Sequence, residues 1–402
     1  MKLLKEKEYK VPGFLVSAIR CGIKKKAGAK DLALIYSEFP ASAAAVFTKN
    51  AVKAAPVILD MERIKSGKGR AVIVNSGNAN ACTGDDGLRK AKEMAKGIAK
   101  ALKIKEDTVY VSSTGVIGEP LPVERITSSI PELVKGLRAD GWMETEAAIM
   151  TTDAFPKMAG VRLEIGGKEV TLLGIAKGAG MIHPNMATML CYIATDCAIS
   201  PGLLDKALRK AVDLSFNSIT VDGDTSTNDT VLVLANGAAG NRPLTPRSKD
   251  MEGFQSALNH VTLELAKMIV RDGEGATKVI EIKIKGATSV AAAKKVANAI
   301  GRSNLVKTAF FGMDPNWGRI AAAAGYSGVK VVQEKMDIYF NDVHVVKKGL
   351  SVGGDWETRA REEMKGAEVR VTVDLNLGKA EATVWASDLT YEYVKINASY
   401  RS

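Results

Sequence analysis

The most constraining feature of this sequence is the alternation, over its first third, of short apolar runs with amphipathic helical segments. Residues 87–104 carry apolar side chains three and four positions apart, which predicts a helix with one buried face. Helices are also expected over 123–137 and 142–150. The runs between them are rich in apolar and β-branched residues and suit buried strands: LALIYS (32–37), AAAVFT (43–48), AVIV (71–74) and TVYV (108–111). This alternation predicts a mixed α/β fold.

The middle of the chain continues the pattern and begins with a hairpin. Gly166-Gly167 is a favoured two-residue turn, and an apolar run flanks it on each side. A Gly-rich segment, KGAGMIHPNMATMLCYIATD (177–196), follows, and its second half reads as a strand. Three further elements are expected here: a helix over 201–219, a strand over 231–236 and a helix over 252–270.

The character of the sequence changes near residue 280. A strand from 279 and a helix over 289–300 precede two stretches in which apolar and polar residues alternate. Such alternation is typical of strands with one wet face. Each stretch reads as a hairpin: DIYFND/VHVVKKG (337–349) and AEVRVTVDL/KAEATVWASD (367–388). We therefore expect a main domain over 1–280 and a smaller α+β domain with an antiparallel sheet over 281–402.

Composition excludes several classes of protein. No run of 18 apolar residues could span a membrane, and the opening MKLLKEKEYK lacks the apolar core of a signal peptide. The net charge is +11, but basic residues are scattered and only 5% of residues are aromatic, which disfavours nucleic-acid binding as a competing hypothesis. The four cysteines have no CxxC spacing and the three histidines lie far apart. We expect no metal site, and reduced cysteines in a cytoplasmic protein.

Five polar or Gly-rich segments interrupt the apolar elements. Loops that follow strands commonly carry function, and glycine permits close backbone approach. One such loop could be an ordinary turn, but five in one chain favour a composite site. The segments are NSGNANACTG (75–84), SSTGVIG (112–118), 177–188, 222–230 and GMDPNWGR (312–319).

Threonine is the candidate nucleophile, because no GxSxG, HExxH, Walker A or GxGxxG motif is present. A hydroxyl needs a base, and a free N-terminal amine, with a pKa of about 7.7–8.0, can serve. An internal threonine gains that amine only if the chain is cut before it. Thr188 lies where the Gly-rich segment meets a strand, so an N-to-O acyl shift and hydrolysis there would expose it. An ordinary threonine opening a strand is the alternative.

The same segment carries a resemblance to a known family. KGAGMIHPNMATML (177–190) closely resembles the self-cleavage motif of the ornithine acetyltransferases, or glutamate N-acetyltransferases, of arginine biosynthesis. Further family-like segments follow the expected order along essentially the whole chain: VNSGNANACTG (74–84), SSTGVIG (112–118), MTTD (150–153), GDTSTNDT (223–230), DGEGATK (272–278), GMDPNWGRI (312–320) and INASYRS (396–402).

The resemblance implies a precursor that cuts itself between Ala187 and Thr188, with Thr188 as the nucleophile of the new chain. Its hydroxyl would take the acetyl group from N-acetylornithine, release ornithine, and pass the acetyl group to glutamate to form N-acetylglutamate. This is ping-pong covalent catalysis. The family is either monofunctional or also accepts acetyl-CoA, and no residue here decides between the two.

The resemblance also implies the roles of other residues. Thr114 and Gly115 match the pair that forms the oxyanion hole, which preorganises donors for the developing negative charge. His183 is expected to be a loop residue rather than the base, and Trp317 to pack beside the site. The residues matching substrate contacts are Thr151, Lys177, Thr188, Glu274, Asn397 and Ser402.

The resemblance implies a four-layer α/β/β/α sandwich followed by the smaller α+β domain, whose C-terminal tail returns to the active site. It implies an α2β2 heterotetramer of the two cleavage products, with no metal or prosthetic group. A self-cleaving aminopeptidase or amidase of the same fold, in which water replaces glutamate, is the competing hypothesis.

Overall fold

Among the residues that the structure describes, the main sheet has nine strands, all within the first 235 residues. The computed structural model describes residues 1–183 and 189–399. The strand order is β1-β6-β7-β8-β10-β3-β4-β5, with β2 beside β3. The strands are β1 (Lys2–Leu3), β2 (Phe14–Ile19), β3 (Leu32–Phe47), β4 (Lys68–Asn78), β5 (Val109–Val116), β6 (Lys157–Ile165), β7 (Lys168–Lys177), β8 (Leu190–Thr195) and β10 (Thr230–Ala235).

Strand β3 joins the two halves of this sheet. Its first part pairs with β2 and β4, and residues 42–47 pair with β10. The two separate strands expected over 32–37 and 43–48 are therefore one, and the expected break was wrong. Its pairing with β4 shifts register between Tyr36 and Ala41. Pro40 lies within this irregularity, where a missing N–H does not interrupt a ladder.

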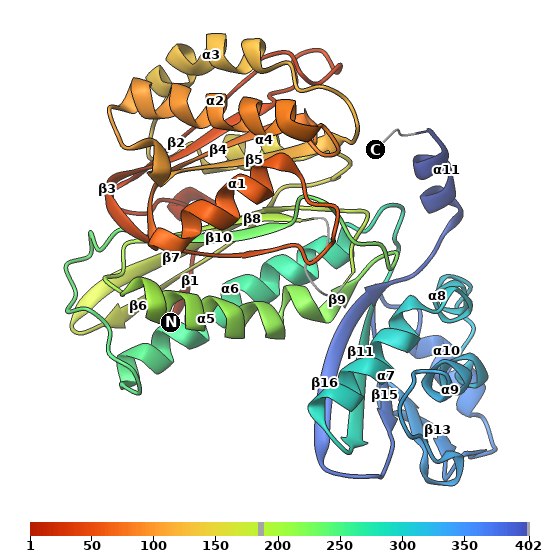
Figure 1. The fold of residues 1–402 in the computed structure, drawn as a ribbon. Helices are drawn as coiled ribbons and strands as arrows, with labels where there is room; N and C mark the ends of the chain where they lie inside the picture. The colour runs from red at the N-terminus through yellow and green to blue at the C-terminus, as the bar shows by residue number, and fades with distance from the viewer. Residues whose placement is uncertain (184–188, 400–402) are drawn as a thin grey trace.

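The sheet halves face each other and helices cover their outer faces, which confirms the expected four-layer α/β/β/α sandwich (Figure 1). The inner core contains Tyr110 from one half, Tyr192 and Leu232 from the other, and Trp142. One outer face packs against α2 and α3, the other against α5 and α6. The helices of the sandwich are α1 (Ala55–Arg63), α2 (Gly84–Leu102), α3 (Val123–Lys135), α4 (Trp142–Ile149), α5 (Pro201–Leu214) and α6 (Lys249–Arg271).

The expected hairpin of β6 and β7 is present. The strands pair antiparallel from Lys157 to Ile165, and the turn consists of Gly166 and Gly167. Both glycines have positive φ, +56° and +74°, as a two-residue type I′ turn requires.

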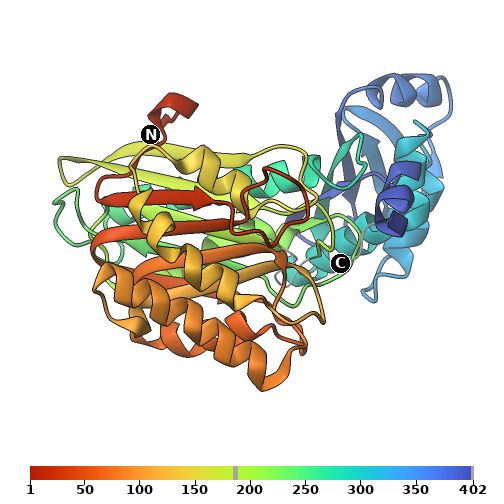
Figure 2. The ribbon, with the colours of Figure 1, turned by 90° about the horizontal axis from the view of Figure 1, so that it is seen from above.

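A second sheet of seven strands lies at one end of the sandwich (Figures 1 and 2). Its order is β14-β13-β12-β15-β11-β16-β9. The strands are β9 (Ile219–Thr220), β11 (Val279–Ala287), β12 (Asp337–Phe340), β13 (Val343–Lys347), β14 (Leu350–Ser351), β15 (Glu368–Asp374) and β16 (Ala380–Ser387). The helices beside it are α7 (Val290–Arg302), α8 (Asn304–Phe311), α9 (Trp317–Gly325) and α10 (Trp356–Glu363). The sheet takes its edge strand β9 from the segment before residue 280.

The expected antiparallel sheet and its second hairpin were wrong. Strand β11 lies between β15 and β16 and pairs parallel with β15 and antiparallel with β16, so the sheet is mixed. The connection after β15 crosses the end of β11, where Leu375 N donates to Lys285 O (2.9 Å) and Leu377 N donates to Gly286 O (2.7 Å). The short connection is typical of a hairpin, but a strand from far upstream in the sequence occupies the position between the two strands.

The last helix, α11 (Tyr391–Ser399), leaves the second sheet and lies back against loops of the sandwich (Figure 1). The Tyr393 hydroxyl is 3.3 Å from the Asp222 carboxylate, and Thr390 Oγ1 donates to Gly275 O at 2.7 Å. None of the described helices combines the length and apolar character needed to cross a bilayer.

The inner core predicts the effect of one truncation. Leu232 is 1% exposed between the two sheet halves, so Leu232→Ala would leave a cavity and lower the free energy of unfolding by about 2–5 kcal/mol. Chemical denaturation measures this change. Leu214→Ala is the control, because Leu214 is 50% exposed at the end of α5. Equal effects of the two substitutions would contradict the assigned inner core.

Candidate active site

A pocket opens where loops from both halves of the sandwich meet α11. Four of the five polar or Gly-rich segments contribute residues to it: 75–84, 112–118, 177–188 and 222–230. Segment 312–319 does not, because it forms the connection after α8 and the start of α9 beside the second sheet. The pocket brings together six residues selected from the sequence: Thr114, Gly115, Thr151, Lys177, Glu274 and Asn397.

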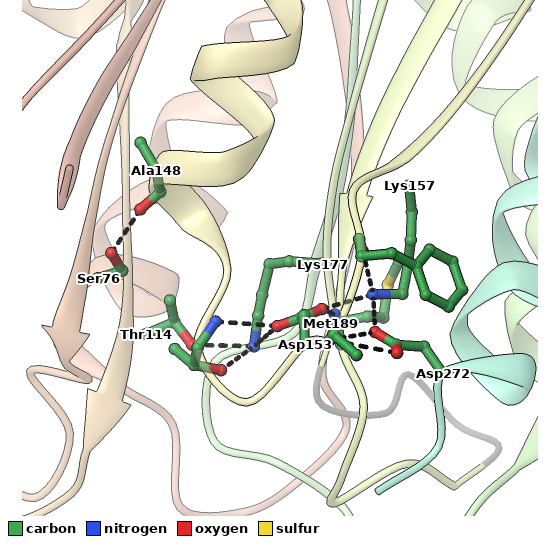
Figure 3. Close-up of polar contacts among 12 residues, drawn as sticks. Ser76, Thr114, Ala148, Asp153, Lys157, Lys177, Met189 and Asp272 are labelled. Atoms are coloured by element: carbon green, nitrogen blue, oxygen red, sulfur yellow. Dashed lines mark hydrogen bonds and ion pairs between the residues drawn. The ribbon is translucent and has the colours of Figure 1, made fainter. Parts of the chain in front are cut away.

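Lys177 is the buried cation of this pocket. It is the last residue of β7 and only 2% exposed. Its Nζ donates to Thr151 Oγ1 at 2.9 Å and lies 3.4 Å from Thr114 Oγ1 (Figure 3). Burial lowers the pKa of Lys177, whereas the nearby Asp153 carboxylate opposes that change. A cation held among hydroxyl groups can receive a ligand carboxylate.

Asp153 fixes the backbone around Lys177. Its carboxylate accepts hydrogen bonds from Thr151 N (2.9 Å) and Gly178 N (2.6 Å), and lies 3.9 Å from Lys177 Nζ. Burial alone would raise the pKa of Asp153, but Lys177 and Lys157 hold it well below its usual range. The carboxylate is therefore ionised, and it sets the positions of two pocket segments.

Lys157 is a fully buried cation shared by two carboxylates. Its Nζ lies 2.7 Å from Asp153 and 2.5 Å from Asp272 (Figure 3). Asp272, which follows α6, also accepts a hydrogen bond from Ala154 N at 3.0 Å. The cluster thus links the start of β6, the loop after α4 and the end of α6.

Glu146 of α4 lies close to this cluster and is 0% exposed. Neither of its carboxylate oxygens has a hydrogen-bond partner among the described residues. Burial raises the pKa of Glu146 to about 8, and the negative charge of Asp153 acts in the same direction. The side chain is therefore largely protonated at neutral pH.

Glu274 and Asn397 also line the pocket. Asn397 Nδ2, on α11, donates to Glu274 Oε2 at 2.7 Å. Gly180 permits this arrangement, because a Cβ there would lie 2.5 Å from the Glu274 carboxylate. A carboxylate at this position can bind an amino group of a ligand.

Gly115 allows the strand ends of β4 and β5 to meet. It has φ +132°, and a Cβ on it would lie 2.3 Å from the carbonyl carbon of Gly77. Asn228 connects the same strands to the segment before β10, because its Nδ2 donates to Ala79 O (2.7 Å) and Ser113 O (2.8 Å).

Two aspartates, the half-buried Asp222 and the fully buried Asp229, accept hydrogen bonds from the backbone of the Gly-rich segment. Asp222 accepts hydrogen bonds from Met181 N (2.6 Å) and Ile182 N (2.9 Å), and Met181 has φ +58°. Asp229 accepts one from Met189 N (3.0 Å), while its Oδ2 has no partner among the described residues. Burial raises the pKa of both carboxyl groups.

Several residues considered in the sequence analysis are not among those that line the pocket. Ala187, Thr188 and Ser402 lie outside the described residues. Trp317 packs against the core of the second sheet and does not line the pocket, so its expected place beside the site was wrong. His183 Nδ1 is 3.5 Å from Thr220 Oγ1, and burial, reinforced by Arg302, lowers its pKa to about 4.

Asp153, Asp272 and Asp229 were not selected from the sequence, although each lies in a motif that was quoted. Lys157 lies four residues after Asp153. The sequence did carry one indication of these aspartates. Each is an acidic residue beside an apolar strand, and a carboxylate that is buried there needs a charged or hydrogen-bonding partner. Within the described part of the chain, no three His, Cys, Asp or Glu residues are grouped so that they could hold a metal ion.

Comparison with known proteins places this geometry in context. The ArgJ family model matches residues 15–402. The arginine biosynthesis bifunctional protein ArgJ of Geobacter sulfurreducens is 55% identical over 392 residues, which cover 98% of this chain and 100% of that protein. ArgJ of Caldanaerobacter subterraneus subsp. tengcongensis is 49% identical, with 100% of both chains covered. The solved structure of ArgJ from Bacillus halodurans is 46% identical, with a TM-score of 0.51, and covers 52% of this chain and 98% of that chain.

The pKa of Glu146 predicts a change in stability with pH. The folded protein binds this proton more tightly than the unfolded chain, so the free energy of unfolding falls as pH rises from about 4.5 to about 8. Glu146→Gln cannot ionise, and we expect the variant to be more stable than the parent by a few kcal/mol near pH 9 and similar near pH 5.

Thermal unfolding at the two pH values measures this difference. Glu132→Gln, at an exposed position on α3, is the matched control and should follow the parent. A Glu146→Gln variant that loses as much stability as the parent at high pH would contradict a protonated Glu146.

Proposed function

Because the chain belongs to the ArgJ family, we propose that it cleaves itself between Ala187 and Thr188 and then transfers acetyl groups from N-acetylornithine to glutamate. Membership makes it an acetyltransferase of arginine biosynthesis. One observation carries the detailed proposal. Lys177 of the pocket pairs in the sheet with Leu190, which follows Thr188 by two positions. The strand after the proposed cut therefore begins beside the buried cation.

The proposed cleavage supplies the base. The Thr188 hydroxyl attacks the carbonyl carbon of Ala187, the peptide bond shifts to an ester, and water hydrolyses that ester. Thr188 is left with a free α-amine, whose pKa of about 7.7–8.0 suits general base catalysis near neutral pH. The solved Bacillus halodurans chain supports this idea. The match takes in 98% of that chain but only 52% of this one, so that chain is about half as long. Cleavage after residue 187 would likewise give two chains that are each about half of the 402 residues.

The proposed transfer has two stages. The α-amine takes the hydroxyl proton while Thr188 Oγ1 attacks the acetyl carbon of N-acetylornithine. The C–N bond breaks, and ornithine leaves with that proton. The α-amine of glutamate then attacks the acetyl-threonine ester, N-acetylglutamate forms, and the threonine oxygen regains a proton. This route needs no metal or prosthetic group.

The pocket residues fit the charges of these substrates. We assign the α-carboxylate of the substrate to Lys177 and Thr151, and its free amino group to Glu274 and Asn397, since the pocket lining offers both a cation and a carboxylate. Ser402 is the remaining proposed contact. Thr114 and Gly115 would donate hydrogen bonds to the oxyanion. The two cleavage products would assemble as α2β2.

Thr188→Ala tests the cleavage and the nucleophile together. Intact mass measurement should give two chains for the parent, beginning at Met1 and Thr188, and one uncut chain of 402 residues for the variant. The variant should have no transfer activity. An uncut parent that is fully active would overturn the mechanism.

The products distinguish a transferase from a hydrolase. With N-acetylornithine and glutamate present, we expect ornithine and N-acetylglutamate in equal amounts. Release of acetate without N-acetylglutamate would instead support the self-cleaving amidase.

Thr114→Val tests the oxyanion hole. Removal of one hydroxyl donor should lower kcat about 10²–10³-fold in the cleaved enzyme. Thr308→Val is the control, because Thr308 is exposed on α8, far along the chain from the pocket segments. A Thr114→Val enzyme with normal kcat would remove Thr114 from the proposed role.

A further inference from the structure

Four buried charged side chains form a continuous charge cluster that ends at Lys177 (Figure 3). Lys177 Nζ lies 3.9 Å from Asp153, Asp153 lies 2.7 Å from Lys157 Nζ, and Lys157 Nζ lies 2.5 Å from Asp272. The two ammonium groups balance the two carboxylates, so the charge cluster is neutral as a whole. A further carboxylate would give it a net negative charge in an interior that screens charge poorly.

Lys157 has no donor left for a further carboxylate. An ammonium group carries three N–H donors. Lys157 Nζ donates to Asp153 Oδ1 (2.7 Å), to Asp272 Oδ2 (2.5 Å) and to the carbonyl oxygen of Phe155 (3.2 Å), which accounts for all three. The positive charge that remains available in the charge cluster is therefore that of Lys177, the lysine that lines the pocket.

Glu146 is a fifth titratable group at this place. It belongs to α4, the helix that leads into Thr151 and Asp153. The side chain is buried, and neither of its oxygens accepts a hydrogen bond from a described residue. Burial raises the pKa of Glu146 to about 8, and the negative charges of Asp153 and Asp272 act in the same direction. An ionised carboxylate without donors is costly in the interior, so Glu146 holds a proton at neutral pH.

Lys24, in the loop between β2 and β3, also acts on Glu146, as do Asp153, Lys157 and Asp272. Its Nζ donates to the carbonyl oxygen of Ala148 in α4 at 3.1 Å. Burial lowers the pKa of Lys24 to about 8, so Lys24 and Glu146 titrate over the same pH range. An experiment on Glu146 must therefore compare proteins that all retain Lys24.

We propose that Glu146 and the α-carboxylate of the substrate compete for the positive charge of Lys177, so that substrate binding draws a proton onto Glu146. This inference rests on the proposed binding of that carboxylate by Lys177. With Glu146 protonated, the substrate adds one negative charge to the neutral charge cluster; with Glu146 ionised, it adds a second. Because linkage is reciprocal, an ionisation that weakens substrate binding must be reversed when the substrate binds. Glu146 thus sets affinity and is not a catalytic residue.

Proton uptake on binding tests this coupling without reference to activity. Ornithine is titrated into the protein near pH 8.5 in buffers that differ in enthalpy of ionisation, which gives the number of protons taken up. If ornithine binds the form with protonated Glu146 about tenfold more tightly, the parent should take up about half a proton more than Glu146→Gln. The amines of the ligand, Lys24 and Lys177 titrate in both proteins, so the difference belongs to Glu146.

Two further variants control this measurement. Glu132→Gln removes an exposed carboxylate of α3 and should match the parent. Glu146→Asp retains a buried acid and should restore the proton uptake that Glu146→Gln lacks. A merely structural role of Glu146 would not give this pattern.

The pH dependence of affinity gives a second readout. Between pH 6.5 and 9.5, KM for N-acetylornithine should rise about fivefold to tenfold more in the parent than in Glu146→Gln, because only the parent ionises at this position. At saturating substrates, kcat should have the same pH profile in both proteins, since Glu146 does not line the pocket.

The possible results separate this inference from the proposed function. Equal proton uptake and equal pH profiles of KM in the parent and Glu146→Gln would overturn the coupling. A parent that shows the expected proton uptake with ornithine but transfers no acetyl group would refute the proposed function and leave the coupling intact. A parent that does not bind ornithine would overturn both.

Discussion

The pocket of the candidate active site depends on a second buried lysine behind it, Lys157, and on the two carboxylates that neutralise its charge. A buried charge without partners is very costly, so the segments carrying Asp153 and Asp272 must meet at β6. The Asp153 carboxylate also accepts hydrogen bonds from the backbone N–H groups of Thr151 and Gly178, and so holds both in place. The position of Lys177 is therefore set by the same interactions that close the core. If Lys177 binds the substrate as proposed, substrate recognition and folding cannot be varied independently.

Much of the fold was predictable where its cause is local. The Gly166-Gly167 turn fixes its own hairpin, and the apolar spacing of 87–104 marks α2 without reference to any other element. Part of the pocket was predictable for a different reason. Thr114, Gly115 and Lys177 lie in short polar segments that interrupt the apolar elements, and the sandwich brings four of the five such segments to one place. Thr151, Glu274 and Asn397 lie outside those segments, and only the family resemblance pointed to them.

The predictions that were wrong concern segments whose partners lie far away in the sequence. Residues 367–388 have the pattern of a hairpin, yet β11 takes the position between β15 and β16 because it pairs along its length with both. Strand β9 joins that sheet from a segment far upstream. Asp272 reaches Lys157 across 115 positions. Nothing in a local pattern specifies such partners, and Trp317 was misplaced for the same reason: its core belongs to the second sheet.

The order of strands in the main sheet has a consequence for the proposed cleavage. Strands β8 and β10 follow the bond between residues 187 and 188, but they lie between β7 and β3, which precede it. They are bonded to those neighbours along their length. A cut at that bond would therefore release nothing: the two polypeptides would remain interwoven in a single sheet. Each would lack the hydrogen-bonding partners it needs to exist alone, so the processed enzyme would consist of two chains but behave as one folding unit.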